Sequence, residues 1–347
     1  MARFYTKADA GAPALYYASN NAVDVRVFGN VKGILKACLV NGYGSGGGAK
    51  PAAGWSLIHE EDRSLTLQNT SGRYVTLTSD AVFIGTASVH NDRHYRVYLH
   101  NTFTGLSGGV PLGEGVVSGV APNSGTPHTA SLNYFGYYTS TSFWAVLADE
   151  NSFYLCTFGP STSTLTSSNI TNFSMDANAR DGQTLYVGDD SRGNFIAAGG
   201  LLGTPGNGNI PSTATFDHAA ITTLHNPHTG LLIDTGGAPD NTSVLGLYQS
   251  AARGGLQPYP RDWFSLNPIE WVCGNKVAGA LRGGFIDLPS THVRAFAAIQ
   301  AWFGGGETVT GEGWLTPVEL ADGYSYMLAP SNYTGKLAII TDNPALW

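Results

Sequence analysis

One segment of the chain has a helical pattern, and this segment constrains the fold more than any other feature. Five apolar side chains recur at helical spacing between residues 30 and 41: Val31, Ile34, Leu35, Cys38 and Leu39. They share one side of a helix with about 3.6 residues per turn. Asn30 is expected to cap the start of this helix and Asn41-Gly42 to end it. So short a helix is marginally stable alone, so we expect its apolar side to pack on a β-sheet.

A glycine-rich loop follows the predicted helix. Residues 42–50 read GYGSGGGAK, which is superficially like a phosphate-binding loop. Such a loop enters a helix and places Ser or Thr after its lysine, whereas Lys50 precedes Pro51 and this loop leaves a helix. Gly44-Ser45-Gly46 is also one residue too short for a nucleophile elbow. We expect a flexible connection or a loop that contacts another subunit.

Most of the other regular structure is predicted to be β-strand, because apolar residues alternate or form short runs between turn residues. The predicted strands include residues 4–5, 23–27, 55–58, 65–68, 74–78, 81–88, 95–99, 143–147, 152–158, 184–187, 194–197, 231–233, 244–248, 263–266, 324–328 and 336–340. Hairpin turns are expected at residues 69–72 and 148–151. A second, weak helix pattern covers residues 293–302. The predicted class is α+β, mostly β, with antiparallel sheets and the 30–41 helix packed on the first sheet.

The domain organisation depends on a stretch rich in Gly, Ser and Pro. Residues 105–130 read GLSGGVPLGEGVVSGVAPNSGTPHTA, which indicates a long loop or a domain junction. We therefore divide the chain into an N-terminal α+β domain, residues 1–125, and a C-terminal β-rich domain, residues 126–347. The alternative is one interleaved domain, because both parts read as pieces of a larger sheet system.

Composition narrows the class of partner. Charged residues make up 12% of the chain, against about 25% in an average soluble protein. Such a neutral, hydroxyl-rich surface is typical of proteins that pack against copies of themselves or one another. The net charge of −7 argues against nucleic acid, which requires clustered Lys and Arg.

The cysteines and the apolar runs bear on the compartment. Cys38, Cys156 and Cys273 lie far apart, which fits neither a zinc site nor a disulfide framework. We expect buried free thiols in a chain folded in a reducing cytoplasm. No signal peptide is expected near residue 1, and no apolar run reaches the roughly 18 residues that a membrane span needs.

The histidines give weak metal-site candidates. His225 and His228 lie three residues apart with only His218 near them, and His90 and His94 flank a turn. Neither spacing matches a zinc motif.

Carboxylates and aromatic residues give weak catalytic and sugar-binding candidates. The carboxylates are Glu60, Glu61, Asp62, Asp189, Asp190 and Glu312, and the aromatic residues that could stack on sugars are Tyr134, Phe135, Tyr137 and Tyr138. Acidic pairs occur throughout the chain and do not single out a site. We predict no catalytic, cofactor or metal site and no enzymatic activity.

Three stretches of the chain are considered together: ILKACLVNGYGSGGGAKPAAGW from residue 34, FWAVLADENSFYLCTF from residue 143 and MLAPSNYTGKLAIITDNPALW from residue 327. In this order they resemble an uncharacterised family of virion structural, tail-associated proteins of tailed bacteriophages. The glycines Gly46, Gly47 and Gly48 are additional to the loop of that family. The resemblance implies no catalytic residues.

The resemblance implies a non-enzymatic virion protein without cofactor, assembled in the bacterial cytoplasm from copies of itself and other virion proteins. The first placement is the tail, baseplate or tail-fibre region. The alternatives are a capsid-decoration or vertex-spike protein of the head, and a virion-borne protein that binds or cleaves glycans, such as a host-surface glycan. Symmetric homo-oligomers are the usual mode of such assemblies, and neither nucleic acid nor membrane insertion is expected.

Overall fold

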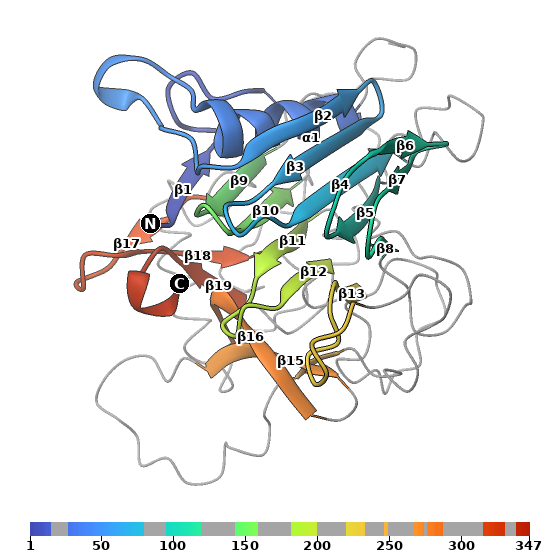
Figure 1. The fold of residues 1–347 in the computed structure, drawn as a ribbon. Helices are drawn as coiled ribbons and strands as arrows, with labels where there is room; N and C mark the ends of the chain where they lie inside the picture. Colours follow the sequence, from blue (N-terminus) through green and yellow to red (C-terminus); the bar gives the residue numbers. More distant parts are fainter. Residues whose placement is uncertain are drawn as a thin grey trace, which may run out of the picture.

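The computed structural model describes residues 1–14, 27–79, 95–118, 143–158, 182–199, 220–232, 246–248, 267–273, 276–286, 315–329 and 338–347. Their strands form two six-stranded sheets, one five-stranded sheet and one two-stranded hairpin (Figure 1). The described strand pairs are antiparallel. The mostly β, antiparallel α+β class is therefore confirmed.

The central sheet has the order β1-β9-β10-β11-β12-β13. Its strands are β1 Arg3–Thr6, β9 Phe143–Ala148, β10 Ser152–Phe158, β11 Gly182–Asp189, β12 Phe195–Gly199 and β13 Ala220–Thr223. The predicted hairpin at residues 148–151 is confirmed, since Phe153 pairs with Ala148. Residues 144–148 of β9 are all buried, which explains their continuous apolar run, because both faces of this strand are covered.

The N-terminal sheet has the order β2-β3-β4-β5-β8. Its strands are β2 Ser56–Glu61, β3 Ser64–Gln68, β4 Tyr74–Ser79, β5 Tyr95–His100 and β8 Val117–Ser118. Leu65 and Leu77 point into the core as cross-strand partners, whereas Thr66 and Thr76 are partners on the opposite face. The period-two pattern of the sequence thus gives the correct strands here.

The third sheet has the order β14-β15-β16-β19-β18-β17. Its strands are β14 Gly246–Tyr248, β15 Asn267–Cys273, β16 Lys276–Ile286, β17 Val318–Glu319, β18 Ser325–Ala329 and β19 Ala338–Thr341. A short 3-10 helix, Pro344–Leu346, follows. The sequence predicts β18 and β19 but not the pair β15–β16.

The helix begins earlier than expected. Helix α1 covers Val27–Leu35 and continues as a π-helix over Lys36–Asn41. Asn30 therefore lies inside the helix, so its prediction as the N-cap was wrong, and Val27 is helical instead of extended. Gly42, with a φ of 72°, ends the helix as predicted. All five apolar side chains of the predicted stripe are buried, together with Phe28.

One hydrophobic core joins the helix to two sheets. It contains Tyr5 of β1, Ile34 of α1, Leu67 of β3, Trp144 of β9 and Leu224 just beyond β13. The boundary expected near residue 125 lies outside the described residues. The described strands on its two sides pack together in this core, and β1 pairs with β9.

Several predictions of loops and strands differ from the structure or fall outside the described residues. Residues 105–118 were expected to be loop, but they contain the hairpin β6–β7 (Gly105–Ser107 and Val110–Leu112) and β8. In the predicted strand 231–233, Leu232 forms an isolated bridge, and in the predicted strand 244–248, Gly246–Tyr248 form β14. Residues 233, 244 and 245 lie outside the described residues. The strands expected at 23–26, 81–88 and 263–266 and the helix at 293–302 lie outside the described residues. Within the described ranges, no helix has the length and apolarity needed to cross a membrane.

Candidate functional site

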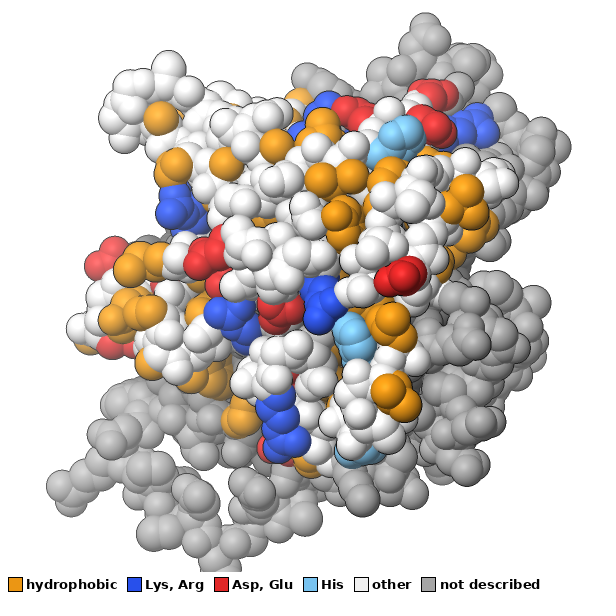
Figure 2. Space-filling model, in the orientation of Figure 1, with side chains coloured by type: hydrophobic (Ala, Val, Ile, Leu, Met, Phe, Trp, Pro, Cys, Tyr) orange, Lys and Arg blue, Asp and Glu red, His pale blue; other side chains and the backbone are white. Residues whose placement is uncertain are grey.

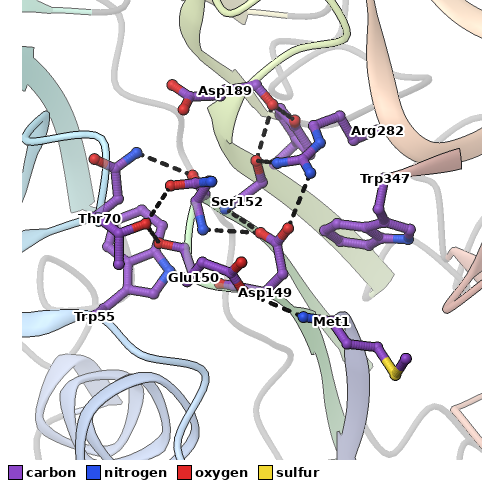
Figure 3. Close-up of polar contacts among 12 residues, drawn as sticks. Met1, Trp55, Thr70, Asp149, Glu150, Ser152, Asp189, Arg282 and Trp347 are labelled. Carbon is purple, nitrogen blue, oxygen red and sulfur yellow. Dashed lines mark hydrogen bonds and ion pairs between the residues drawn. The ribbon is translucent and has the colours of Figure 1, made fainter. Parts of the chain in front are cut away.

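A partly buried ion pair connects the hairpin β9–β10 to strand β16 (Figure 3). Arg282 Nη2 lies 3.0 Å from Asp149 Oδ2. The other carboxylate oxygen, Asp149 Oδ1, accepts hydrogen bonds from the backbone N–H groups of Asn151, at 2.9 Å, and Ser152, at 2.7 Å. The carboxylate therefore closes its own turn and also neutralises an arginine from the third sheet.

The serine beside this pair is bonded to backbone and guanidinium. Ser152 Oγ donates to the carbonyl of Asp189 at 2.8 Å and accepts from Arg282 Nη1 at 3.4 Å. The Tyr154 hydroxyl donates to the Arg282 carbonyl at 2.8 Å. Neither partner of the Ser152 hydroxyl is a base that could activate it, and Ser152 is fully buried. The chemistry of the cluster is that of a structural junction.

An aromatic side chain covers the arginine. The indole ring of Trp347 lies 5.6 Å from the guanidinium carbon of Arg282, within the range of a cation–π interaction. The indole N–H of Trp347 donates to the Thr341 carbonyl at 2.6 Å. Gly283 beneath the ring has a φ of 64°, and a Cβ there would overlap the indole. A glycine is required at this position both for its conformation and for the close approach.

The N-terminal sheet reaches the same junction. Trp55, next to β2, donates its indole N–H to the Asp149 carbonyl at 2.9 Å. In the turn between β3 and β4, the Thr70 backbone N–H donates to the Glu150 carbonyl at 3.1 Å. Turn 149–152 is thus a point at which the three sheets meet (Figure 3).

A second buried carboxylate, Asp190, joins the turn between β11 and β12 to β15. Its Oδ2 accepts from the indole N–H of Trp271 at 2.7 Å, and its Oδ1 accepts from the backbone N–H groups of Arg192 and Asn194, each at 2.8 Å. Of the two candidate acids, Asp190 joins two elements through its carboxylate, whereas Asp189 accepts a hydrogen bond through its backbone carbonyl. Burial raises the pKa of Asp189, whose carbonyl accepts the Ser152 hydrogen bond.

The carboxylates of β2 are held by the helix. Lys36 Nζ lies 2.7 Å from Glu60 Oε2, and Lys32 Nζ lies 3.5 Å from Glu60 Oε1. Burial raises the pKa of Glu60, but the hydrogen bond and charge of Lys36, with those of Lys32, outweigh it and leave this pKa below its usual value. Lys32 also donates to the Glu61 carbonyl. These groups attach β2 to α1.

The glycine loop is fixed at its base and exposed at its tip. The Tyr43 hydroxyl donates to Asp9 Oδ2 at 2.7 Å, and Lys50 Nζ lies 3.2 Å from Asp9 Oδ1. Tyr43 and Lys50 also form a β-bridge. Between them, Gly46–Gly48 form an exposed 3-10 turn that projects from the molecule, at the upper left of Figure 1. The contacts of Asp9, Tyr43 and Lys50 thus fix the base of the loop, while its tip is exposed.

Strand β2 presents an apolar edge. It is an edge strand of the N-terminal sheet, and five of its six residues are exposed. Leu57 is 41% exposed and Ile58 is 38% exposed. A register shift between Leu57 and His59 leaves Ile58 without a cross-strand partner. The edge therefore offers adjacent apolar side chains to another molecule.

The histidine and cysteine candidates have structural partners. His228 Nε2 lies 2.9 Å from the Cys273 carbonyl oxygen, and His225 forms a β-bridge with Leu232. The thiols of Cys38, Cys156 and Cys273 are free and buried, and burial raises their pKa values, that of Cys156 to about 12. In the part of the chain that the structure describes, no three metal-ligating side chains cluster.

Several candidates cannot be placed. The following lie outside the described residues: His90, His94, His218, Glu312, Tyr134, Phe135, Tyr137 and Tyr138. Among the described residues, the best-formed polar cluster is the Asp149–Arg282 junction, which sequence reasoning did not identify. Only the predicted turn at residues 148–151 pointed toward it.

Comparison with known proteins adds no relative. No protein-family model, no curated protein and no solved structure matches the chain. The bacteriophage resemblance stays a prediction, and function is inferred from the geometry of the described residues.

Proposed function

We propose that this chain is a non-enzymatic structural subunit of a bacteriophage virion, located in the tail, baseplate or tail-fibre region. The observation that carries the proposal is the exposed apolar edge at Leu57 and Ile58. Its support comes from a scaffold in which buried polar groups are used to join sheets, and from the resemblance of the three sequence stretches to virion proteins.

The edge suits a contact between subunits. Unpaired strand edges readily meet another chain, and adjacent exposed apolar residues are a common mark of an interface. The bulge at Ile58 disfavours addition of a further strand, so the contact is expected to be made by side chains. Because Lys32 and Lys36 neutralise Glu60 on the same strand, few uncompensated charges would be desolvated.

A head protein could use the same edge. In a baseplate or fibre, contacts follow the three- or six-fold symmetry of the tail, whereas a capsid-decoration protein lies on lattice axes of the head. The edge itself is compatible with both arrangements, so location is the property to measure.

The test is immunogold labelling of intact particles with antibody against this chain, viewed by electron microscopy. Label at the tail or its tip is the expected result. Label over the head would replace the tail placement with capsid decoration. Absence of the chain from purified particles, checked by mass spectrometry, would overturn the virion proposal.

A pair of variants tests the edge itself. Ile58→Lys is expected to lower incorporation of the chain into particles, because a charge would be buried in the contact. Val277→Lys is the matched control, since Val277 is a similarly exposed apolar residue, 37% exposed, on β16. Equal incorporation of both variants, with both folded, would exclude β2 as the contact.

A further inference from the structure

Four aromatic rings from three strands and one loop form a row on the outer face of the N-terminal sheet. Phe103 lies with its ring centroid 5.5 Å from that of His59 and 5.7 Å from that of His100. Tyr74 stacks on His100, with centroids 5.5 Å apart and an interplanar angle of 18°. We name the set His59, Tyr74, His100 and Phe103 the aromatic row.

Strand register explains why the rings share one face. Gln68, Tyr74 and His100 are successive cross-strand partners on β3, β4 and β5, and His59 is the partner of Thr66. Direct partners point to the same side of a sheet. That side is opposite to the core residues Leu67 and Val75, so the aromatic row faces away from the hydrophobic core.

The row is built on a fixed base. His100 is fully buried, its Nδ1 lies 3.0 Å from the Thr102 carbonyl oxygen and its Nε2 lies 2.8 Å from Thr76 Oγ1. Burial lowers the pKa of His100 to about 4, so the ring is neutral near neutral pH. Because Nδ1 must donate to the carbonyl, Nε2 then accepts from the Thr76 hydroxyl, and the ring is held at both nitrogens. Thr76 Oγ1 in turn lies 2.8 Å from Thr66 Oγ1. Because His100 is held in this way, the rings of Tyr74 and Phe103 that contact it are positioned before any ligand binds.

The upper part of the row is accessible. Tyr74 and Phe103 are partly exposed, and the His59 side chain is 33% exposed. Figure 2 shows hydrophobic side chains and a histidine gathered over this side of the N-terminal sheet and the hairpin β6–β7. Ring faces that are already ordered can bind a ligand with little further loss of side-chain entropy.

Two neutral polar side chains, Ser56 and Gln68, lie beside the rings. Ser56 and Gln68 are cross-strand partners in the same line as Tyr74 and His100, and both reach the surface. The carboxylate near the row is Glu61, with Oε1 3.1 Å from His59 Nε2. The Gln68 Nε2 donates to the Gly72 carbonyl at 3.5 Å. An anionic ligand would meet the Glu61 carboxylate, and a wholly apolar ligand would cover the Gln68 amide oxygen and the Ser56 hydroxyl without offering them a hydrogen bond.

We propose that the aromatic row binds a neutral saccharide. The C–H face of one sugar ring would pack on Phe103 and Tyr74, and its hydroxyl groups would bond to the Gln68 amide and the Ser56 hydroxyl. Rings with nearby hydroxyl and amide groups match the mixed polar and apolar surface of a sugar. Phosphate-bearing ligands are disfavoured, because the charged side chain that is described in contact with the row is the Glu61 carboxylate. This site does not depend on where the chain lies in a particle.

The test is binding of the purified full chain to an array of neutral and acidic oligosaccharides, followed by titration calorimetry with the best neutral binder. Phe103→Leu retains an apolar side chain beside His59 and His100 but removes the ring. This variant and Tyr74→Ala are expected to bind about five- to tenfold more weakly than wild type. Tyr74→Phe should bind as wild type does, and Tyr324→Ala, a partly exposed tyrosine next to β18, is the control for loss of an aromatic side chain elsewhere.

Thermal unfolding of each variant must first establish that it is folded. Retention of acidic sugars alone would overturn the choice of a neutral ligand. Lack of any binding by the wild-type chain, or wild-type affinity in folded Phe103→Leu and Tyr74→Ala, would overturn the site. None of these results bears on the particle location, which immunogold labelling measures separately.

Discussion

Arg282 and Asp149, which come from different sheets, form a partly buried ion pair of 3.0 Å, and the carbonyl of the same arginine accepts a hydrogen bond from the Tyr154 hydroxyl. One residue of β16 is therefore held by its side chain and by its backbone. This double attachment places the third sheet against the central sheet. Several predictions about stability depend on it and on the other buried groups of the fold.

Asp149→Asn is expected to lower the free energy of unfolding by about 2–4 kcal/mol. The variant leaves the Arg282 guanidinium, whose side chain is 17% exposed, without its anionic partner and weakens the turn at Ser152. Urea unfolding measures the change. Glu114→Gln, at an exposed carboxylate, is the control and should change stability by less than about 0.5 kcal/mol. Equal effects of the two variants would contradict the role of the ion pair.

Gly283→Ala is expected to destabilise the protein by about 1–3 kcal/mol. Alanine is strained at a φ of 64°, and its Cβ would overlap the Trp347 indole. Gly29→Ala in helix α1 is the contrasting variant, because no atom lies within 4 Å of the added methyl group, and a gain of up to about 1 kcal/mol is expected. Thermal unfolding of both variants should therefore show shifts of opposite sign.

Because His100 is buried, the protein is expected to lose stability in acid. Burial lowers its pKa to about 4, against a usual value of 6.5, although the hydrogen bond to Thr102 opposes this shift. The folded state thus favours neutral His100, whose stabilising contribution is complete above the unfolded pKa and is lost as the pH falls toward the folded pKa. The full loss is about 3 kcal/mol.

The measurement for His100 is urea unfolding at about pH 7 and about pH 4.5. His100→Gln, which retains a donor and an acceptor but does not titrate, is the comparison. Wild type should lose more stability than this variant over the interval, by roughly 2–3 kcal/mol. An identical loss in the two proteins would assign the acid sensitivity to other groups.

Leu35 tests the packing of the helix on the core. Because Leu35 is fully buried, Leu35→Ala should cost about 2–5 kcal/mol, and Leu35→Asp should give no soluble folded protein because a charge would be buried. Leu112→Asp is the matched control at a leucine that is 47% exposed, and it should fold normally. Native-like Leu35→Asp protein, judged by circular dichroism, would show that the stripe is not essential to the core.

Shortening Gly46–Gly48 by two residues should leave the fold intact and impair assembly. The glycines are exposed, and the contacts among Asp9, Tyr43 and Lys50 hold the loop at its base, so the free energy of unfolding should change by less than about 1 kcal/mol. Incorporation into particles is the second measurement. A variant that loses stability and incorporation together would identify the loop as part of the fold.

The sequence predicts the fold best where one physical signal dominates. Leu65, Leu67, Val75 and Leu77 alternate with polar residues, and their strands are predicted correctly because one face of that sheet is in the core. The helical stripe from Val31 to Leu39 is predicted correctly because one side of the helix also lies in the core. The start of the helix was predicted wrongly. Residues 23–27 alternate apolar and charged side chains as a strand does, although Val27 and Phe28 already belong to α1.

Strands β15 and β16 show why other parts could not be predicted. Pro268 and the glycines of β16 interrupt any apolar pattern. Gly279 is required because the Asp190 carboxylate and the Trp271 indole approach its backbone closely, which is a contact between distant segments. The residues next to Gly279 in the sequence therefore do not indicate that a glycine is required there.

The two candidate sites were hidden in different ways. The pair Asp149–Arg282 depends on two sheets meeting, so neither residue is marked by its neighbours in sequence. In the aromatic row, alternation places Tyr74 and His100 on one face of adjacent strands, and this part could have been derived. Phe103 lies in a loop, and its position between His59 and His100 follows only from the folded chain.

The pairing of β1 with β9 also determines when the protein can fold during its synthesis. Residues 3–6 leave the ribosome long before residues 143–148, their partners in the sheet. At translation rates of about 5–20 residues per second, the wait is on the order of ten seconds. During that interval the apolar face of α1 and the free edge of β1 have no complete core to cover them, so nascent chains are open to chaperones and to one another. The yield of soluble protein is thus expected to depend on translation speed and chaperone supply.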